Sequence, residues 1–176
     1  ESKEIMIQKA AFNKDLSHKE IYEAILPVIG ALITPGEPVI SVLSNITAVI
    51  KEAFGKVSWA GFYLLKENTL YLGPFQGKLA CTIIPAGKGV CGTSLVNKET
   101  IIVDDVDKFE GHIACDSESR SEIVVPIIKN GAAYGVIDID STGYAQFNNT
   151  DRFYLEKIAE LIADKIDLEI LKNIII

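Results

Sequence analysis

The residue type best suited to covalent chemistry here is a cysteine in a long polar segment. Cys115 lies within Asp104–Ser121, a stretch of 18 residues. Loops longer than about 12–15 residues are uncommon in compact domains, and they are usually either functional or disordered. Phe109 and Ile113 are apolar side chains that a disordered linker would not need. We therefore predict an ordered lid over a pocket, with Cys115 as the nucleophile.

Charged neighbours act on the Cys115 thiol in both directions. His112 and Arg120 would lower its pKa from the usual value of about 8.5 and favour the reactive thiolate. Asp116 and Glu118 would raise the pKa instead. The sequence alone leaves the direction of the shift open.

The other two cysteines have different surroundings. Cys81 falls in a predicted strand, and Cys91 lies at a glycine turn that leads into a predicted short helix. No pair of cysteines has the Cys-x-x-Cys spacing, so the sequence predicts no metal site. Cys81 and Cys91 are either small core residues or thiols that form a disulfide after turnover.

Three carboxylates accompany the thiol. Asp138 and Asp140 share one face of a predicted strand, and Ile137 and Ile139 share the other face. Two residues apart in a strand, the Asp Cα atoms are separated by about 7 Å, so the pair could bracket one cation. A solvent-exposed strand face is the alternative. Glu122, partly buried beneath the lid, would have a raised pKa and serve as an acid; otherwise it is an exposed residue at a strand end.

Aromatic residues complete the candidate site. Trp59, Gly61 and Tyr63 share one strand face, so a glycine gap separates two rings and could hold a small apolar group or a sulfur atom. Ordinary core packing is the alternative. Together, the thiol, the acid, the Asp pair and the aromatic gap predict a small zwitterionic ligand that meets a nucleophilic cysteine.

These residues need a scaffold, and the hydrophobic periodicity predicts an α+β domain. Two N-terminal helices, a central antiparallel sheet and a C-terminal helix follow in order, and the terminal helices should cover one sheet face. Pro27 should kink or split the first helix, Gly55 should end the second in a left-handed conformation, and Asn130-Gly131 should form a tight hairpin. The predicted helices are Ser17–Thr34, Pro38–Phe54, a short one ending near Lys98, and Thr150 to about Asn173; the predicted strands are Val57–Leu65, Thr69–Gly73, Ala80–Ile84, Thr100–Val103, Glu122–Lys129 and Ala132–Asp140.

Composition limits the class of protein. With 176 residues, 48% hydrophobic and 23% charged, the chain fits one globular domain. A net charge of −7 argues against nucleic acid and membrane surfaces as partners. No uncharged apolar run approaches the roughly 18 residues of a membrane span, and no signal segment is recognisable. An odd number of cysteines argues against a secreted disulfide scaffold, so we expect a cytoplasmic protein.

Six ordered stretches resemble the free methionine-(R)-sulfoxide reductases, which are single GAF-domain enzymes. The resemblance covers roughly Ser17 to Leu168 and implies a GAF domain at residues 17–172, with an N-terminal extension (1–16) and a short tail (173–176). The Gly-His-Ile-Ala-Cys-Asp run is its most specific part. The stretches are Trp59–Tyr63, Leu72–Lys78, Gly87–Thr93, Gly111–Ser117, Ser119–Pro126 and Val136–Ser141.

The resemblance implies a mechanism. Cys115 would attack the sulfoxide sulfur, release methionine and become a sulfenic acid. Cys81 is the favoured resolving cysteine, with Cys91 as rival or relay, and thioredoxin would reduce the disulfide without a bound cofactor. Glu122 would act on the sulfoxide oxygen. A homodimer is a further expectation from the family.

The resemblance also assigns the substrate-binding groups. Asp138 and Asp140 would hold the ammonium group or share the role of Glu122, and Trp59 with Tyr63 would enclose the S-methyl group. Backbone N–H groups of Gly87–Gly92 would meet the carboxylate. The rival functions are a GAF domain that senses a ligand without turnover and a redox sensor that forms a regulatory disulfide.

Overall fold

The structure is a computed structural model that describes residues 16–113 and 116–174. Within these residues, six strands form one antiparallel sheet in the order β3-β2-β1-β6-β5-β4. The elements are α2 (His18–Leu32), α3 (Val39–Ala53), β1 (Val57–Lys66), β2 (Thr69–Gln76), β3 (Ile83–Pro85), α4 (Gly89–Asn97), β4 (Ile101–Val103), the 3₁₀ turn η1 (Val106–Lys108), β5 (Ser121–Lys129), β6 (Ala132–Ser141), α5 (Asn149–Lys165) and α6 (Glu169–Ile174).

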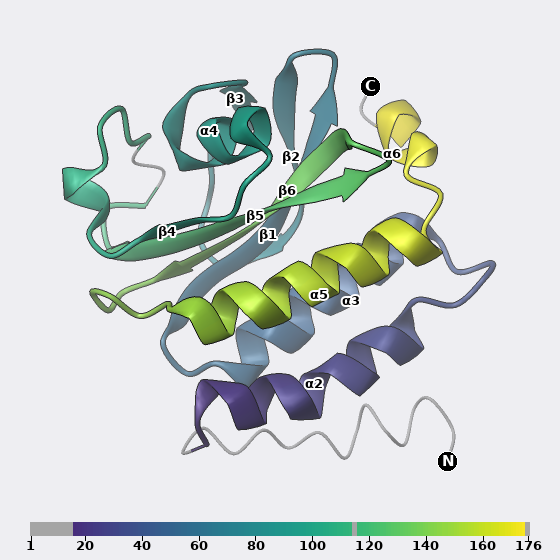
Figure 1. Cartoon of the computed structure of the whole chain (residues 1–176), viewed down its shortest axis with the longest axis horizontal. Helices are drawn as coiled ribbons and strands as arrows, with labels where there is room; N and C mark the ends of the chain where they lie inside the picture. The colour runs from purple at the N-terminus through teal and green to yellow at the C-terminus, as the bar shows by residue number, and fades with distance from the viewer. Residues whose placement is uncertain (1–15, 114–115, 175–176) are drawn as a thin grey trace.

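The helices α3 and α5 lie across one face of the sheet, and α2 packs against both of them (Figure 1). The short helix α4 and the long loops lie on the opposite face (Figure 1). This arrangement confirms the α+β prediction with the terminal helices on one side. It leaves the second face of the sheet to be covered by α4 and loops alone.

Strand alternation divides the core into two parts. Ile123 on β5 and Ile137 and Ile139 on β6 pack against the helices. Val124 and Val136, their neighbours in sequence, belong to a second apolar cluster beneath α4. Successive side chains in a strand point to opposite faces, so each central strand contributes to both clusters. Burial on both sides fixes the register, because a shift of one residue would exchange the two sets.

The β5–β6 hairpin is the turn that the sequence predicted. Lys129 pairs with Ala132, and between them Asn130 and Gly131 have φ values of 51° and 76°. Two successive positive φ angles define the type I′ turn, which Asn-Gly adopts readily. The turn sets the pairing of Lys129 with Ala132, and a register shift between Ile127 and Ile128 then places Glu122 opposite Asp140.

Several predicted element boundaries are wrong. Pro27 lies inside α2 without splitting it, because buried neighbours such as Ile25 and Ile29 hold the helix together despite one missing hydrogen bond. Gly55 does not have the predicted left-handed conformation, and α3 ends with Phe54 as its C-cap in extended conformation. The predicted strand Ala80–Ile84 is shorter, since only Ile83–Pro85 pairs with β2.

The C-terminal helix differs from its prediction at both ends. Asn148, not Thr150, is the N-cap of α5, because its side chain accepts from the Thr150 N–H at 2.7 Å while Asp151 accepts from the Asn148 N–H. The helix then ends at Lys165, and α6 begins at Glu169. The intervening Ile166 and Leu168 are both buried, so core packing bends the chain away from a single long helix.

Candidate active site

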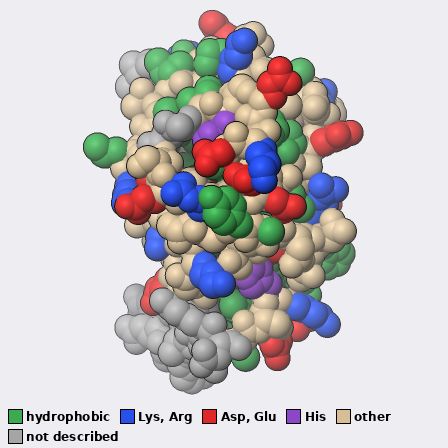
Figure 2. Space-filling model, turned by 90° about the vertical axis from the view of Figure 1, so that its left-hand side faces the viewer, with side chains coloured by type: hydrophobic (Ala, Val, Ile, Leu, Met, Phe, Trp, Pro, Cys, Tyr) green, Lys and Arg blue, Asp and Glu red, His purple; other side chains and the backbone are tan. Residues whose placement is uncertain are grey.

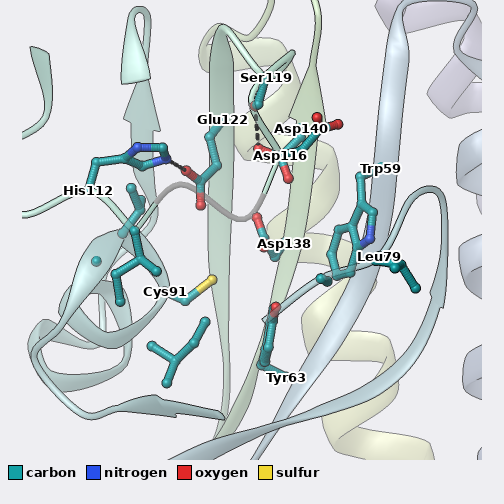
Figure 3. A pocket seen from close by; sticks show the side chains of 15 residues that line it. Trp59, Tyr63, Leu79, Cys91, His112, Asp116, Ser119, Glu122, Asp138 and Asp140 are labelled. Carbon is teal, nitrogen blue, oxygen red and sulfur yellow. Dashed lines mark hydrogen bonds and ion pairs between the residues drawn. The ribbon is translucent and has the colours of Figure 1, made fainter. Parts of the chain in front are cut away.

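A hollow opens on the loop-covered face of the sheet (Figure 3). Side chains from β1, β5, β6, α4 and the segment before β5 line it. They include Trp59, Tyr63, Cys91, Glu122, Asp138 and Asp140, which are six of the eight residues predicted for the site. Cys81 lies in the loop before β3, close to this group, and Cys115 lies outside the described residues.

The strand register brings the carboxylates together. Asp140 on β6 pairs with Glu122 on β5 and with Trp59 on β1. Asp138, two residues earlier, pairs with Val124 and Gly61. The sequence placed the two Asp residues on one face, and the structure adds Glu122 directly across the strand pair. Sequence spacing could not give this neighbour, because it depends on how β5 and β6 pair.

Burial controls the protonation of these carboxyl groups. Desolvation raises the pKa of Glu122 well above its ordinary value, and the charges of Asp138 and Asp140 raise it further. Desolvation and Asp140 likewise raise the pKa of Asp138. Asp140 has a pKa raised to about 6 by burial, although a hydrogen bond from Ser119 at 2.6 Å lowers it. Burial and the neighbouring carboxyl groups therefore favour the protonated form of Glu122, the form that can donate a proton.

Cys91 and Cys81 have different environments. Cys91 lies in the first turn of α4 as a free, buried thiol, and burial, followed by the charges of Asp138 and Glu122, raises its pKa. Such a thiol is a poor nucleophile at neutral pH. Cys81 is disulfide-bonded and lies outside the strand predicted for it, with its carbonyl oxygen accepting from the Tyr63 hydroxyl at 2.9 Å.

The aromatic residues do not leave the predicted gap. A Cβ atom at Gly61 would lie 2.2 Å from Cη2 of Trp59 and 2.6 Å from Cβ of Phe75. The Trp59 ring itself covers the glycine and stacks 6.0 Å from Tyr63, between ring centroids. The prediction of an open notch at Gly61 is wrong. Glycine is needed there to let the indole lie flat against β1, where Trp59 forms a wall of the hollow and donates to the Lys78 carbonyl at 3.2 Å.

The predicted anion nest at Gly87–Gly92 is only partly available. The N–H groups of Gly87, Lys88 and Gly92 already donate to backbone carbonyls within this turn. Gly89, Val90 and Cys91 form the first turn of α4, whose N–H groups have no partner inside the helix. Any anion bound here would therefore meet the N-terminus of α4 and not the whole turn.

Three further lining residues were not among the predicted catalytic and substrate-binding residues, although His112 and Asp116 were expected to influence the Cys115 thiol. His112 Nε2 lies 3.8 Å from Oε2 of Glu122, and burial lowers its pKa. Ser119 donates to Asp140, and Asp116 lies at the edge of the hollow. Their proximity to the loop cysteine was visible in the sequence, but their partners lie on β5 and β6 and could not be read from spacing.

An ion-pair group bridges two loops at the mouth of the hollow. Lys78, after β2, bonds to Glu118 and lies 3.8 Å from Asp116, both on the segment before β5. Figure 2 views the molecule from the end where these loops lie, and acidic and basic side chains gather across the middle of that face. The contact connects the β2–β3 loop to the segment before β5, which the sequence predicts to be a lid.

The fold, with its loop-covered hollow, is that of the GAF class, and the GAF domain family matches residues 37–167. The chain is 48% identical over 159 residues to free methionine-R-sulfoxide reductase of Saccharomyces cerevisiae, covering 86% of this chain and 88% of that protein. It is 41% identical over 143 residues to the Escherichia coli protein of the same name, covering 81% of this chain and 87% of that protein. The chain belongs to the free methionine-(R)-sulfoxide reductase family.

A solved structure supports the same membership. Free methionine-R-sulfoxide reductase from Neisseria meningitidis, in complex with its substrate, superimposes with a TM-score of 0.83 at 41% identity. The match covers 94% of this chain and 99% of that one. Among the described residues, none of the helices has the length and apolar character needed to cross a membrane.

Proposed function

We propose that this protein reduces free L-methionine-(R)-sulfoxide to methionine, with Cys115 as the nucleophile. The observation that carries the proposal is the group of three carboxyl side chains, Glu122, Asp138 and Asp140, that the sheet register gathers in one hollow. An acidic, enclosed site suits an amino acid, whose ammonium group needs negative partners and whose sulfoxide oxygen needs a proton donor. The names of the yeast and Escherichia coli relatives supply the substrate class.

The first chemical step joins the thiol to the sulfoxide. The Cys115 thiolate attacks the sulfoxide sulfur while Glu122 protonates the oxygen, which makes the sulfur more electrophilic. Methionine leaves, and the oxygen ends on Cys115 as a sulfenic acid. In balance, one thiol and one sulfoxide give one sulfenic acid and one thioether. The raised pKa of Glu122 supports its role as the acid.

The second step regenerates the thiol. A resolving cysteine condenses with the sulfenic acid, forming a disulfide and one water molecule, and thioredoxin then reduces the disulfide to two thiols. Cys81 is favoured as the resolving residue because it is disulfide-bonded here, whereas Cys91 is a free thiol. This cycle needs no bound cofactor, and it requires a reducing compartment, for which we propose the cytoplasm. A homodimer remains a prediction.

The substrate backbone is assigned to two sides of the hollow. Asp140, whose pKa of about 6 leaves it mostly ionised at neutral pH, and Asp138 receive the ammonium group. The carboxylate meets the free N–H groups at the N-terminus of α4, where the helix dipole favours an anion. Trp59 and Tyr63 receive the S-methyl group with their stacked rings.

A turnover assay with the reduced protein tests the proposal. With thioredoxin or a dithiol as reductant, the protein should produce methionine from the R epimer and not from the S epimer. Cys115→Ser should lower activity to background, whereas Ser117→Ala, a matched control on the same segment, should retain it. Production of methionine by Cys115→Ser would refute the nucleophile. Binding of the sulfoxide without turnover by the unaltered chain would indicate a ligand sensor.

Mass spectrometry of the oxidised protein tests the resolving residue. We expect a Cys81–Cys115 linkage in the peptides after one turnover without reductant. In Cys81→Ser, the sulfenic acid at Cys115 should persist long enough to be trapped with a dimedone-type reagent. A Cys91–Cys115 linkage in the unaltered protein would assign the resolving role to Cys91.

A further inference from the structure

Three potential metal ligands from different elements meet at the inner end of the hollow. Cys91 comes from α4, Glu122 from β5 and Asp138 from β6. Their ligand atoms, one sulfur and two carboxylate oxygens, all lie within 4.8 Å of one another. In Figure 3 the three side chains point toward a common space. All three are buried, with 3%, 5% and 6% of their surfaces exposed.

One oxygen atom of these ligand groups lacks a hydrogen-bond partner, although the Asp138 carboxyl group also interacts with Cys91 and Glu122. Oδ1 of Asp138 is buried and has no hydrogen-bond partner among the described residues. Buried polar atoms are almost always paired, so an unpaired carboxylate oxygen that faces a hollow indicates a missing ligand. No lysine or arginine is among the described residues that line the hollow. The acidic cluster therefore has no side-chain cation to balance it.

We propose that Cys91, Glu122 and Asp138 form a binding site for a thiophilic divalent cation, represented by Zn²⁺. Zinc accepts thiolate, imidazole and carboxylate ligands at about 2.0–2.3 Å in tetrahedral geometry, which places neighbouring ligand atoms roughly 3–4 Å apart. The three atoms need to approach by only about 1 Å to meet this geometry. Ca²⁺ and Mg²⁺ require six or more oxygen ligands or several waters, so they fit this set poorly.

His112 borders this group without joining it. Its Nε2 atom lies 3.8 Å from Oε2 of Glu122. Among the described residues, however, only Cys91, Glu122 and Asp138 form a group whose ligand atoms all lie within 4.8 Å of one another. A water molecule would complete the tetrahedral set. Binding displaces the thiol proton of Cys91 and any carboxyl protons that the other two ligands hold, so the metal exchanges for protons and no redox step is involved.

Metal binding and turnover should exclude each other. Glu122 and Asp138 are the groups assigned above to the sulfoxide oxygen and the ammonium, so an ion bound to them occupies the substrate's place. This consequence rests on the proposed function, whereas the site itself does not. It also departs from the sequence prediction of no metal ligands, because the site joins one cysteine to carboxylates that are distant in sequence.

Cobalt provides a spectroscopic test on the full-length, reduced protein. Co²⁺ should bind at a 1:1 ratio with a thiolate-to-metal charge-transfer band, and Zn²⁺ should displace it. Cys91→Ser should abolish the band, whereas Cys81→Ser and Cys115→Ser should retain it. The site is refuted if the band persists in Cys91→Ser or disappears in either control. It is equally refuted if the unaltered protein shows no band.

A second variant covers the case in which Cys91→Ser fails to fold. Asp138→Asn keeps the thiol and the size of the side chain, and it should weaken Zn²⁺ binding at least about 10-fold. Unchanged affinity in this variant would overturn the assignment of Asp138. Ser58→Ala, whose buried hydroxyl also lacks a hydrogen-bond partner, is a matched control and should bind Zn²⁺ normally.

Competition separates this proposal from the proposed function. The apparent Kd for Zn²⁺ should rise with the concentration of L-methionine-(R)-sulfoxide, and micromolar Zn²⁺ should inhibit turnover reversibly on addition of a chelator. A protein that binds Co²⁺ through Cys91 but reduces no sulfoxide would keep the site and refute the function. A protein that reduces the sulfoxide but forms no thiolate–metal band would keep the function and refute the site.

Discussion

The two faces of the central sheet are built from the same strands and differ sharply in chemistry. On β6, Ile137 and Ile139 pack against α3 and α5 in a continuous apolar core. Between and beside them, Asp138 and Asp140 face the hollow. The helix-covered face needs only apolar side chains of suitable shape. The loop-covered face holds buried acids, which destabilise the fold while they remain without a ligand.

This contrast explains how the site acquires unusual protonation states. A carboxyl group on an exposed sheet would titrate normally, but α4 and the loops exclude water from Glu122. The rigid helix-covered core holds β5 and β6 in register, so Asp138 and Asp140 cannot move away from Glu122. Their mutual proximity then raises the pKa values. The helix-covered face thus provides the rigidity that keeps the buried carboxyl groups of the other face close together.

The largest expected effect comes from Glu122 and its sequence neighbour on the opposite face. Glu122→Gln removes the proton donor and should lower kcat/KM by about 10²–10⁴-fold, the usual range for a general acid. It should not lower the thermal midpoint. Ile123→Val, the matched control, should cost about 0.5–1.5 kcal/mol of stability and leave the activity of folded molecules unchanged. Full activity in Glu122→Gln would refute the role of Glu122 as proton donor, and with it the catalytic function of the loop-covered face.

Truncation of a side chain on the helix-covered face should instead lower stability. Ile139 is almost completely buried between β6 and the helices. Ile139→Ala should lower the free energy of unfolding by about 2–5 kcal/mol, measured by urea denaturation. Leu79→Ala is the control, because Leu79 is 89% exposed and its loss should change stability by less than about 0.5 kcal/mol. Similar losses in both variants would contradict the assigned core.

The stability of the unaltered protein should fall with rising pH because of the acids on the loop-covered face. Between the ordinary pKa of 3.8 and the raised folded values, the folded protein binds more protons than the unfolded chain. The free energy of unfolding therefore decreases as pH rises through that window, which for Asp140 runs from about 4 to about 6. Well below pH 3.8 the effect vanishes, since both states are then protonated.

Asp138→Asn isolates this effect. The variant lacks one titrating acid, so its stability should decline less steeply with pH than that of the unaltered protein. Relative to the unaltered protein, it should gain stability between pH 5 and pH 8, measured by denaturant unfolding at each pH. Asp151→Ala tests the helix side instead, where loss of the carboxylate that accepts from the Asn148 N–H and contacts His18 and Tyr22 should destabilise the protein at both pH values. Parallel pH profiles for Asp138→Asn and the unaltered chain would refute the raised pKa.

Hydrophobic periodicity in the sequence was sufficient for the layout of the fold. The apolar alternation in β5 and β6 and the Asn130-Gly131 turn predict the hairpin, whereas the register shift between Ile127 and Ile128 that places Glu122 opposite Asp140 was not predicted. The errors occurred where long-range packing decides the outcome. Pro27 is tolerated within α2, and buried Ile166 and Leu168 bend the C-terminal chain. Neither effect has a local signature.

The composition of the site was partly predictable, but its geometry was not. Asp138 and Asp140 follow from a period of two, so their common face was predictable. The meeting of Cys91 with Glu122 and Asp138 depends on where α4 packs on the sheet. The predicted gap at Gly61 is absent because the ring of Trp59 turns back over the glycine, a conformation that the sequence does not indicate.

The smallest effect is expected at the mouth of the hollow, where the side chains of Lys78 and Glu118 are exposed to solvent. Lys78 joins the loop after β2 to Glu118 and Asp116, yet its side chain is largely exposed. Exposed ion pairs contribute little and are screened by salt, so Lys78→Ala should raise KM by no more than about fivefold while kcat stays unchanged. Lys56→Ala changes the net charge equally at a site away from the hollow and should leave KM unaltered.

If the ion pair holds the loop in place, the difference between the two variants should disappear in about 1 M salt, where the Debye length is about 3 Å. A KM increase in Lys78→Ala that persists in high salt would instead assign this residue to packing, because screening removes charge effects and leaves contact effects intact.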